Sequence, residues 1–231
     1  MQRTVRSFDE ELTRLRETLL RMGTLAERQF ALSLQALVER DADLARKVCA
    51  DDLEIDQLEH AVNEQVVRFL ALRSPVADDL RLVVTALKIA GDLERIADNA
   101  ANIAKRSLSV AESLPLPSIG AVRRIGTLVQ RQLRDTLDAG IQRDAEKALA
   151  VWNSDLEVDE TYSGLFRELL TYMMEDPHTI GPASHLLFVA KNIERIGDHA
   201  TNISEMVYFV ITGKRIAGER PKNDSSSSTV A

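Results

Sequence analysis

The sequence is poor in the residues that interrupt or cross-link a chain. Its 231 residues include ten glycines, six prolines and one cysteine, Cys49. Because a lone cysteine cannot form an intramolecular disulfide, a disulfide framework is excluded. Glycine and proline also fail to recur about every ten residues, as they do between the strands of an all-β chain. These shortages favour long, uninterrupted helices.

Aromatic residues, basic charge and long apolar runs are scarce as well. Aromatic residues make up 4% of the chain, too few for base-stacking platforms or for the aromatic girdles of a membrane protein. The net charge of −7 argues against a polyanionic ligand. Charges interrupt every window of the ~18 residues that a membrane-spanning helix needs, and the N-terminus lacks the apolar stretch of a signal peptide. We expect a cytoplasmic protein that binds no nucleic acid and reaches membranes only through protein partners.

What the sequence does contain is apolar residues at helical spacing. In the first 37 residues they recur in steps of three and four, and Ser7 and Glu10 have the spacing of a capping box at the start of the run. Similar patterns continue along the chain, with breaks at prolines. The predicted helices are 8–37, 43–72, 77–109, 119–142, 144–174 and 182–213.

The second half of the chain repeats the first. Residues 52–56 (Asp-Leu-Glu-Ile-Asp) match residues 155–159 (Asp-Leu-Glu-Val-Asp), and residues 93–103 match residues 193–203. The sequence therefore predicts an all-α protein, a tandem duplication of an antiparallel three-helix bundle with six long helices. We expect the first repeat at 1–113 and the second at 118–213. The serine-rich remainder, 214–231, has the composition of a disordered tail.

Carboxylates spaced four residues apart occupy equivalent places in both repeats. Such pairs repel each other by about 0.2–0.5 kcal/mol on an exposed helix, and a cation would turn that repulsion into attraction. All-oxygen ligation suits hard cations such as Mg²⁺, Ca²⁺ or Mn²⁺, or iron, whereas zinc more often recruits His or Cys. The candidate ligands are Asp52, Asp56, Glu94, Asp98, Asp155, Asp159, Glu194 and Asp198, with Glu59, Asn102 and Asn202 as a second tier.

The alternative is a solvated acidic face on which Arg95 and Arg195 form weak surface ion pairs. Because the pairs recur in both repeats, we favour metal ligation. A catalytic site is not expected: the sole Glu-x-x-His match, Glu175 and His178, straddles Pro177, and neither a glycine-rich phosphate loop nor a nucleophile elbow occurs. We predict that the protein is not an enzyme.

Several segments together resemble the PhoU family over about residues 8–214. They are the paired blocks 93–98 and 193–198, together with 79–82 and 170–176. The resemblance implies a negative regulator of the bacterial phosphate-starvation response and of phosphate uptake. It also implies an adapter between the ATPase subunit of the high-affinity phosphate ABC transporter and the phosphate-responsive histidine kinase. Exposed stripes on long helices favour self-association, so we also expect a homodimer. The family's metal motifs fall on the four carboxylate pairs, with iron, zinc, manganese or magnesium as the implied ions.

The acidic stripes of the two repeats are not identical. Glu59 and Asn63 extend the acidic stripe of the first repeat, whereas Tyr162 and Phe166 stand at the equivalent places of the second. We therefore expect two unequal metal sites, the second poorer in ligands. A helical metal-binding or storage protein without signalling partners stays open as the alternative function.

Overall fold

The computed structural model describes residues 2–51, 53–73, 75–113, 116–218 and 220, without the side chains of residues 2–8. These residues form α-helices and no strand, so the all-α prediction is confirmed. The elements are α1 (Gln2–Glu39), α2 (Ala42–Ala50), α3 (Leu53–Arg73), α4 (Ala77–Glu112), α5 (Ile119–Gln142), α6 (Ala145–Asn153), α7 (Asp155–Glu175), the short 3₁₀ helix η1 (Pro177–Thr179) and α8 (Ile180–Thr212).

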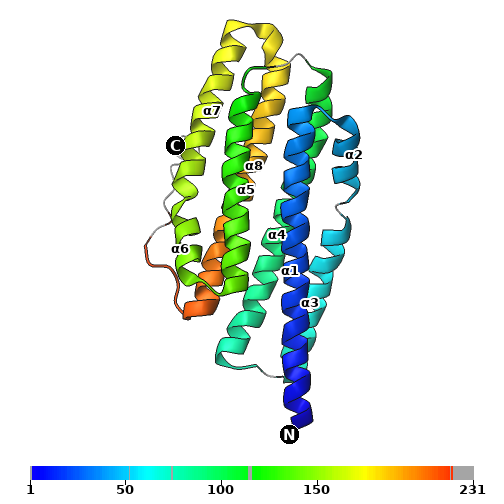
Figure 1. The fold of residues 1–231 in the computed structure, drawn as a ribbon, viewed down its shortest axis with the longest axis vertical. Coiled ribbons are helices and arrows are strands. Elements are labelled where there is room, and N and C mark those ends of the chain that lie inside the picture. The colour runs from blue at the N-terminus through cyan, green and yellow to red at the C-terminus, as the bar shows by residue number, and fades with distance from the viewer. Residues whose placement is uncertain (1, 52, 74, 114–115, 219, 221–231) are drawn as a thin grey trace, which may run out of the picture.

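The two repeats lie side by side as two three-rod bundles with their helices along the long axis of the molecule (Figure 1). In each repeat the middle rod consists of two helices, α2 with α3 and α6 with α7. The third helices of the repeats, α4 and α8, run antiparallel and pack against each other, while α1 covers α4 and α5 covers α8. The predicted tandem duplication is confirmed. Within the described part of the chain, no helix is long and apolar enough to cross a membrane.

Two details of the predicted helices are wrong. The first helix begins at Gln2, so Ser7 lies inside α1 and is not its N-cap, because nothing in residues 2–6 stops the helix from extending backwards. The middle rods, expected as continuous helices over 43–72 and 144–174, are each broken in two. The second break lies at Ser154, whose amide donates to the carbonyls of Ala150 and Val151, and α7 begins at the next residue.

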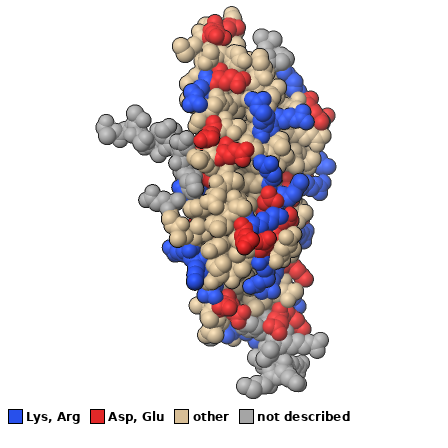
Figure 2. Space-filling view, turned by 60° about the vertical axis from the view of Figure 1, so that its left-hand side comes forward, with Lys and Arg blue, Asp and Glu red and all other residues tan. Residues whose placement is uncertain are grey.

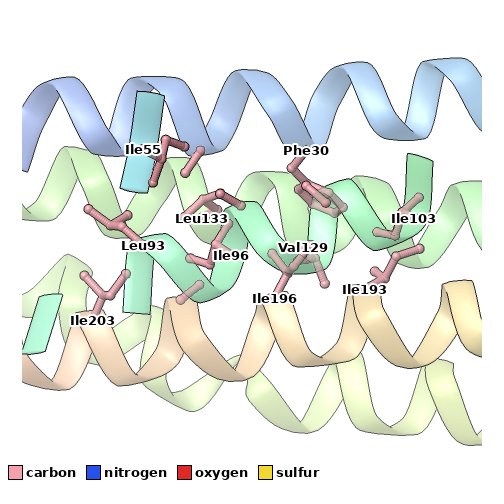
Figure 3. Packing of buried hydrophobic residues seen from close by; sticks show 14 of the residues in the cluster. Phe30, Ile55, Leu93, Ile96, Ile103, Val129, Leu133, Ile193, Ile196 and Ile203 are labelled. Carbon is pink, nitrogen blue, oxygen red and sulfur yellow. The ribbon is translucent and has the colours of Figure 1, made fainter. Parts of the chain in front are cut away.

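The core forms where α4 and α8 meet. Leu93, Ile96 and Ile103 of α4 approach Ile193, Ile196 and Ile203 of α8, with Val129 of α5 beside them (Figure 3). Helices α1 and α5 approach each other closely where one of them has a glycine. A Cβ at Gly23 would lie 2.7 Å from Leu137, and a Cβ at Gly126 would lie 2.7 Å from Leu34. The same small-to-large fit thus occurs twice across the α1–α5 contact, as expected for duplicated units.

The repeated tripeptide Arg-Asp-Ala builds the same turn after α1 and α5. Arg40 and Arg143 adopt left-handed backbone conformations with φ of 56° and 54°, which end their helices. The aspartates that follow cap the next helices: Asp41 accepts from the amide of Leu44 at 2.9 Å, and Asp144 accepts from the amide of Lys147 at 2.9 Å.

The two arginines provide a matched test of this turn. A left-handed conformation costs a non-glycine residue about 1 kcal/mol, so Arg143→Gly should raise the free energy of unfolding by about that amount. Arg40→Gly should not, because the Arg40 guanidinium donates to the carbonyls of Ala111 at 2.6 Å and Ser113 at 2.5 Å. Urea denaturation of both variants measures the difference. Equal effects of the two substitutions would contradict this interpretation.

Candidate functional site: acidic clusters on the two repeats

Three predicted ligands of the first repeat form one group, which we call the first acidic cluster: Asp56, Glu94 and Asp98. Glu94 and Asp98 lie one turn apart on α4, and Asp56 lies on the adjoining α3. Burial raises the pKa of Glu94, and the charges of Asp98 and Asp56 raise it further, whereas Arg95 opposes them. The carboxylates are therefore close enough to repel one another.

Glu94 of the first acidic cluster lines a cleft of about 490 Å³ that also reaches α8, and Lys88 lines the same cleft. Glu59 lines this cleft and accepts a hydrogen bond from the Asn63 amide at 2.8 Å. Beside Glu94 the chain has Gly91, and a Cβ there would have nothing within 4 Å. Arg95 lies 3.4 Å from Glu94, but its side chain is 62% exposed, so solvent weakens the pair.

The second acidic cluster comprises Asp155 and Asp159 of α7 with Glu194 and Asp198 of α8. Three of its members are nearly inaccessible: Asp155 is 2% exposed, Glu194 5% and Asp159 6%. Burial raises the pKa of Glu194, the Lys191 ammonium opposes that effect, and Asp198 and Asp159 add to it. The second cluster is therefore the more deeply buried of the two.

Cations of the chain itself accompany the second acidic cluster. The Arg220 guanidinium donates to both carboxylate oxygens of Asp155 at 2.7 Å and to Asp198 Oδ1 at 2.8 Å. Lys191 Nζ lies 2.8 Å from Glu194 Oε2. Residues 219 and 221–231 of the predicted tail lie outside the described residues, whereas Arg220 returns to the body of the second repeat.

On its inner side the second acidic cluster joins a buried polar chain. Gln132 of α5 donates to Thr201 Oγ1 at 2.9 Å, and the Thr201 hydroxyl donates to Asp155 Oδ1 at 3.1 Å. Asn202 accepts from Arg220 at 3.2 Å and, on the other side, donates to Asp92 of α4 at 3.5 Å. The two repeats are therefore connected through polar contacts next to both clusters.

The structure places the predicted ligands as follows. Asp52 lies outside the described residues, and Asn102 is exposed on α4. As placed, no three His, Cys, Asp or Glu side chains in the described ranges form a group that could hold a metal ion. The donor chemistry fits a hard cation better at the open first acidic cluster than at the second, where Arg220 and Lys191 already form ion pairs with Asp155, Asp198 and Glu194.

Sequence reasoning missed Lys191, Arg220, Gln132 and Thr201. Comparison of the repeats carries a signal for Lys191, because Gly91 stands at the equivalent place of the first repeat. For Arg220 the sequence has no such signal, since it follows the last helix and the periodic pattern. Acidic and basic side chains are interspersed on the face shown in Figure 2, which agrees with the modest negative net charge.

The repulsion within the first acidic cluster predicts that Glu94→Gln stabilises the metal-free protein. The pKa of Glu94 in the folded protein lies above its ordinary value of 4.5. Ionisation of Glu94 therefore lowers the stability as the pH rises from the pKa of the unfolded state to that of the folded state. At pH 7 in chelator, the variant should gain about 0.5 kcal/mol in unfolding free energy. The gain should shrink as the pH falls toward 4.5 and vanish well below it, where the carboxyl group is protonated in both the folded and the unfolded state.

Glu160→Gln is the matched control, because Glu160 is exposed on α7. Denaturant unfolding of the parent, Glu94→Gln and Glu160→Gln proteins, at pH 7 and at a pH well below 4.5, provides the measurement. A Glu94→Gln variant that is less stable than the parent at pH 7 in chelator would contradict the prediction.

Comparison with known proteins supplies the family. A family model described as the PhoU domain matches the chain twice, over residues 19–107 and 122–207. The phosphate-specific transport system accessory protein PhoU homolog of Caulobacter vibrioides is 49% identical over 222 residues, which cover 96% of each chain. The homolog of the same name from Rhizobium meliloti is 47% identical over 96% of this chain and 94% of that protein.

Comparison with solved structures identifies the same family. The crystal structure of PhoU from Pseudomonas aeruginosa superposes with a TM-score of 0.87 at 41% identity, covering 90% of this chain and 100% of that chain. The phosphate transport system regulatory protein PhoU from Streptococcus pneumoniae gives a TM-score of 0.83 at 30% identity, covering 91% of this chain and 99% of that one. The two matched domains coincide with the two three-rod bundles, and the chain belongs to the PhoU family.

Proposed function

We propose that this protein is a regulatory accessory protein of phosphate transport. The observation that carries the proposal is the similarity over 96% of both chains to a relative named for that role. The similarity extends through both repeats, so it covers the whole double bundle and is not confined to a short motif. The role is therefore proposed for the double bundle as a whole.

Within that role we propose a cytoplasmic adapter that represses the phosphate-starvation response. It would bind the ATPase subunit of the phosphate ABC transporter and the phosphate-responsive histidine kinase. Large apolar side chains that are exposed on both repeats are the candidate contacts. Val67, Leu72 and Val76 are 66%, 63% and 73% exposed in the first repeat, and Met174 and Phe188 are 85% and 52% exposed in the second. The same side chains are candidates for contacts in the proposed homodimer.

We propose further that the first acidic cluster binds a metal ion, with Asp52 and Glu59 as additional donors. A cation would relieve the mutual repulsion of Glu94, Asp98 and Asp56. Oxygen donors favour magnesium, manganese or iron over zinc, which more often takes nitrogen and sulfur ligands. The ion would also reverse the local charge, and so give an otherwise acidic cleft an affinity for anions such as phosphate.

Complementation tests the regulatory role. The gene is expressed in a Caulobacter vibrioides strain that lacks its own 49% identical homologue, and alkaline phosphatase activity is measured in phosphate-rich medium. A repressor should return the activity to the level of the unmodified strain. Activity that stays high while immunoblots show normal amounts of the protein would contradict the proposal.

Separate binding assays with the purified ATPase subunit and with the cytoplasmic part of the kinase then test the adapter role. An adapter retains both partners. A helical metal-storage protein retains neither, although it still carries metal.

A further inference from the structure

We propose that the second acidic cluster is a guanidinium-binding site, filled by the chain's own Arg220, and that this contact closes the cluster to metal. The inference rests on the proposed metal-binding role, because it assigns metal binding to the first acidic cluster and excludes it from the second. The two duplicated units would then use the same carboxylate positions for two different cations.

The contacts of Arg220 have the geometry of a built site. Its Nε donates to Asp155 Oδ2 and a terminal nitrogen to Asp155 Oδ1, both at 2.7 Å, so the carboxylate is held by two parallel hydrogen bonds. The same terminal nitrogen reaches Asp198 Oδ1 at 2.8 Å, and the other reaches Asn202 Oδ1 at 3.2 Å. The Arg220 side chain is 18% exposed and that of Asp155 is 2% exposed.

Burial explains why Asp155 needs this partner. A carboxylate removed from water is costly unless it is paired and its oxygens accept hydrogen bonds. Thr201 supplies one hydrogen bond to Asp155 Oδ1 at 3.1 Å, but a hydroxyl carries no charge. Among the described contacts of Asp155, the guanidinium is the group that neutralises it.

The same contacts oppose metal binding. A metal ion would need the Asp155 and Asp198 oxygens that already accept hydrogen bonds from Arg220, and the two cations would repel each other at that distance. Glu194 is occupied in a similar way, because Lys191 Nζ lies 2.8 Å from it and 5.3 Å from the centre of the Tyr162 ring. Metal and Arg220 therefore compete for one set of ligands.

The first repeat lacks the residues that supply this closure. Gly91 stands where the second repeat has Lys191, and Glu59 stands where it has Tyr162. After the third helix of the first repeat, α4, the chain enters α5 at Ile119, so no segment equivalent to the one that carries Arg220 follows it. In the described ion pairs of the first acidic cluster the cation is Arg95, whose 62%-exposed side chain is a weak partner, and Lys88 lines the adjoining cleft.

Manganese titration of the full chain, with free Mn²⁺ followed by electron paramagnetic resonance, tests the assignment. The parent protein should bind one Mn²⁺ per chain, and Glu94→Gln/Asp98→Asn should abolish that binding. Arg220→Gln should bind a second Mn²⁺, whereas Arg215→Gln, which alters an exposed arginine of the same segment, should still bind one. An unchanged stoichiometry in Arg220→Gln would overturn the closure, as would a parent site that is lost in Asp198→Asn.

Thermal unfolding in chelator tests the arginine contact without metal. Arg220→Gln should lower the Tm by about 5–10 °C, because it leaves Asp155 buried without a charged partner. Arg215→Gln should leave the Tm unchanged, and Asp155→Asn should restore much of the loss in the Arg220→Gln background. Equal Tm values for the two arginine variants would overturn the guanidinium site.

The two measurements separate failures of the two proposals. If neither the parent nor Arg220→Gln binds Mn²⁺, metal binding at the first acidic cluster fails and the closure to metal fails with it. The Tm series then still decides whether Arg220 occupies the second acidic cluster. If the parent binds one Mn²⁺ and Arg220→Gln also binds one, the first cluster keeps its metal and the closure is wrong.

Discussion

The antiparallel contact between α4 and α8 fixes the position of both acidic clusters. Each of these helices must bury one apolar face against the other, as Ile103 and Ile193 do (Figure 3), and each also packs against the outer rods of its own repeat. The acidic side chains are left at the seam between the third helix and the middle rod. Glu94 therefore lies near Asp56, and Glu194 lies near Asp159. One packing constraint, applied twice, produces two clusters with the same framework.

This regularity is why much of the fold could be predicted from sequence. Apolar residues at helical spacing indicate each rod, and the two matching blocks indicate that the rods occur in two copies. The pairing of Glu94 with Asp98 follows from helix geometry alone, while its proximity to Asp56 follows once α3 packs on α4. The breaks in the middle rods were not predicted, because the apolar stripe continues across them: Val48 and Ile55 lie on opposite sides of the first break and are both buried.

The arrangement around the second acidic cluster is beyond such reasoning. Arg220 follows Gly213, where the last helix ends in a left-handed turn, and no periodic pattern relates it to Asp155. Its place is decided by the electrostatic cost of burying Asp155, which the sequence does not reveal until the burial is known. Lys191 is different, because its contrast with Gly91 is visible when the repeats are compared. Sequence patterns therefore do not predict an ion pair such as Arg220 with Asp155, in which one partner lies outside the duplicated unit.

Burial and the capacity for an external cation oppose each other in these clusters. Asp155 is so deeply buried that the folded chain has to supply its counter-charge, and the residue that does so takes the oxygens an ion would use. The Glu94 side chain is 24% exposed, so water and the exposed Arg95 suffice, and Glu94 lines the cleft. A duplicated acidic unit can therefore diverge while both copies keep the paired carboxylates of their third helices, Glu94 with Asp98 and Glu194 with Asp198. Deeper burial converts one copy into an internal ion pair, and the carboxylates of the open copy stay exposed to the cleft, where we propose that an ion binds.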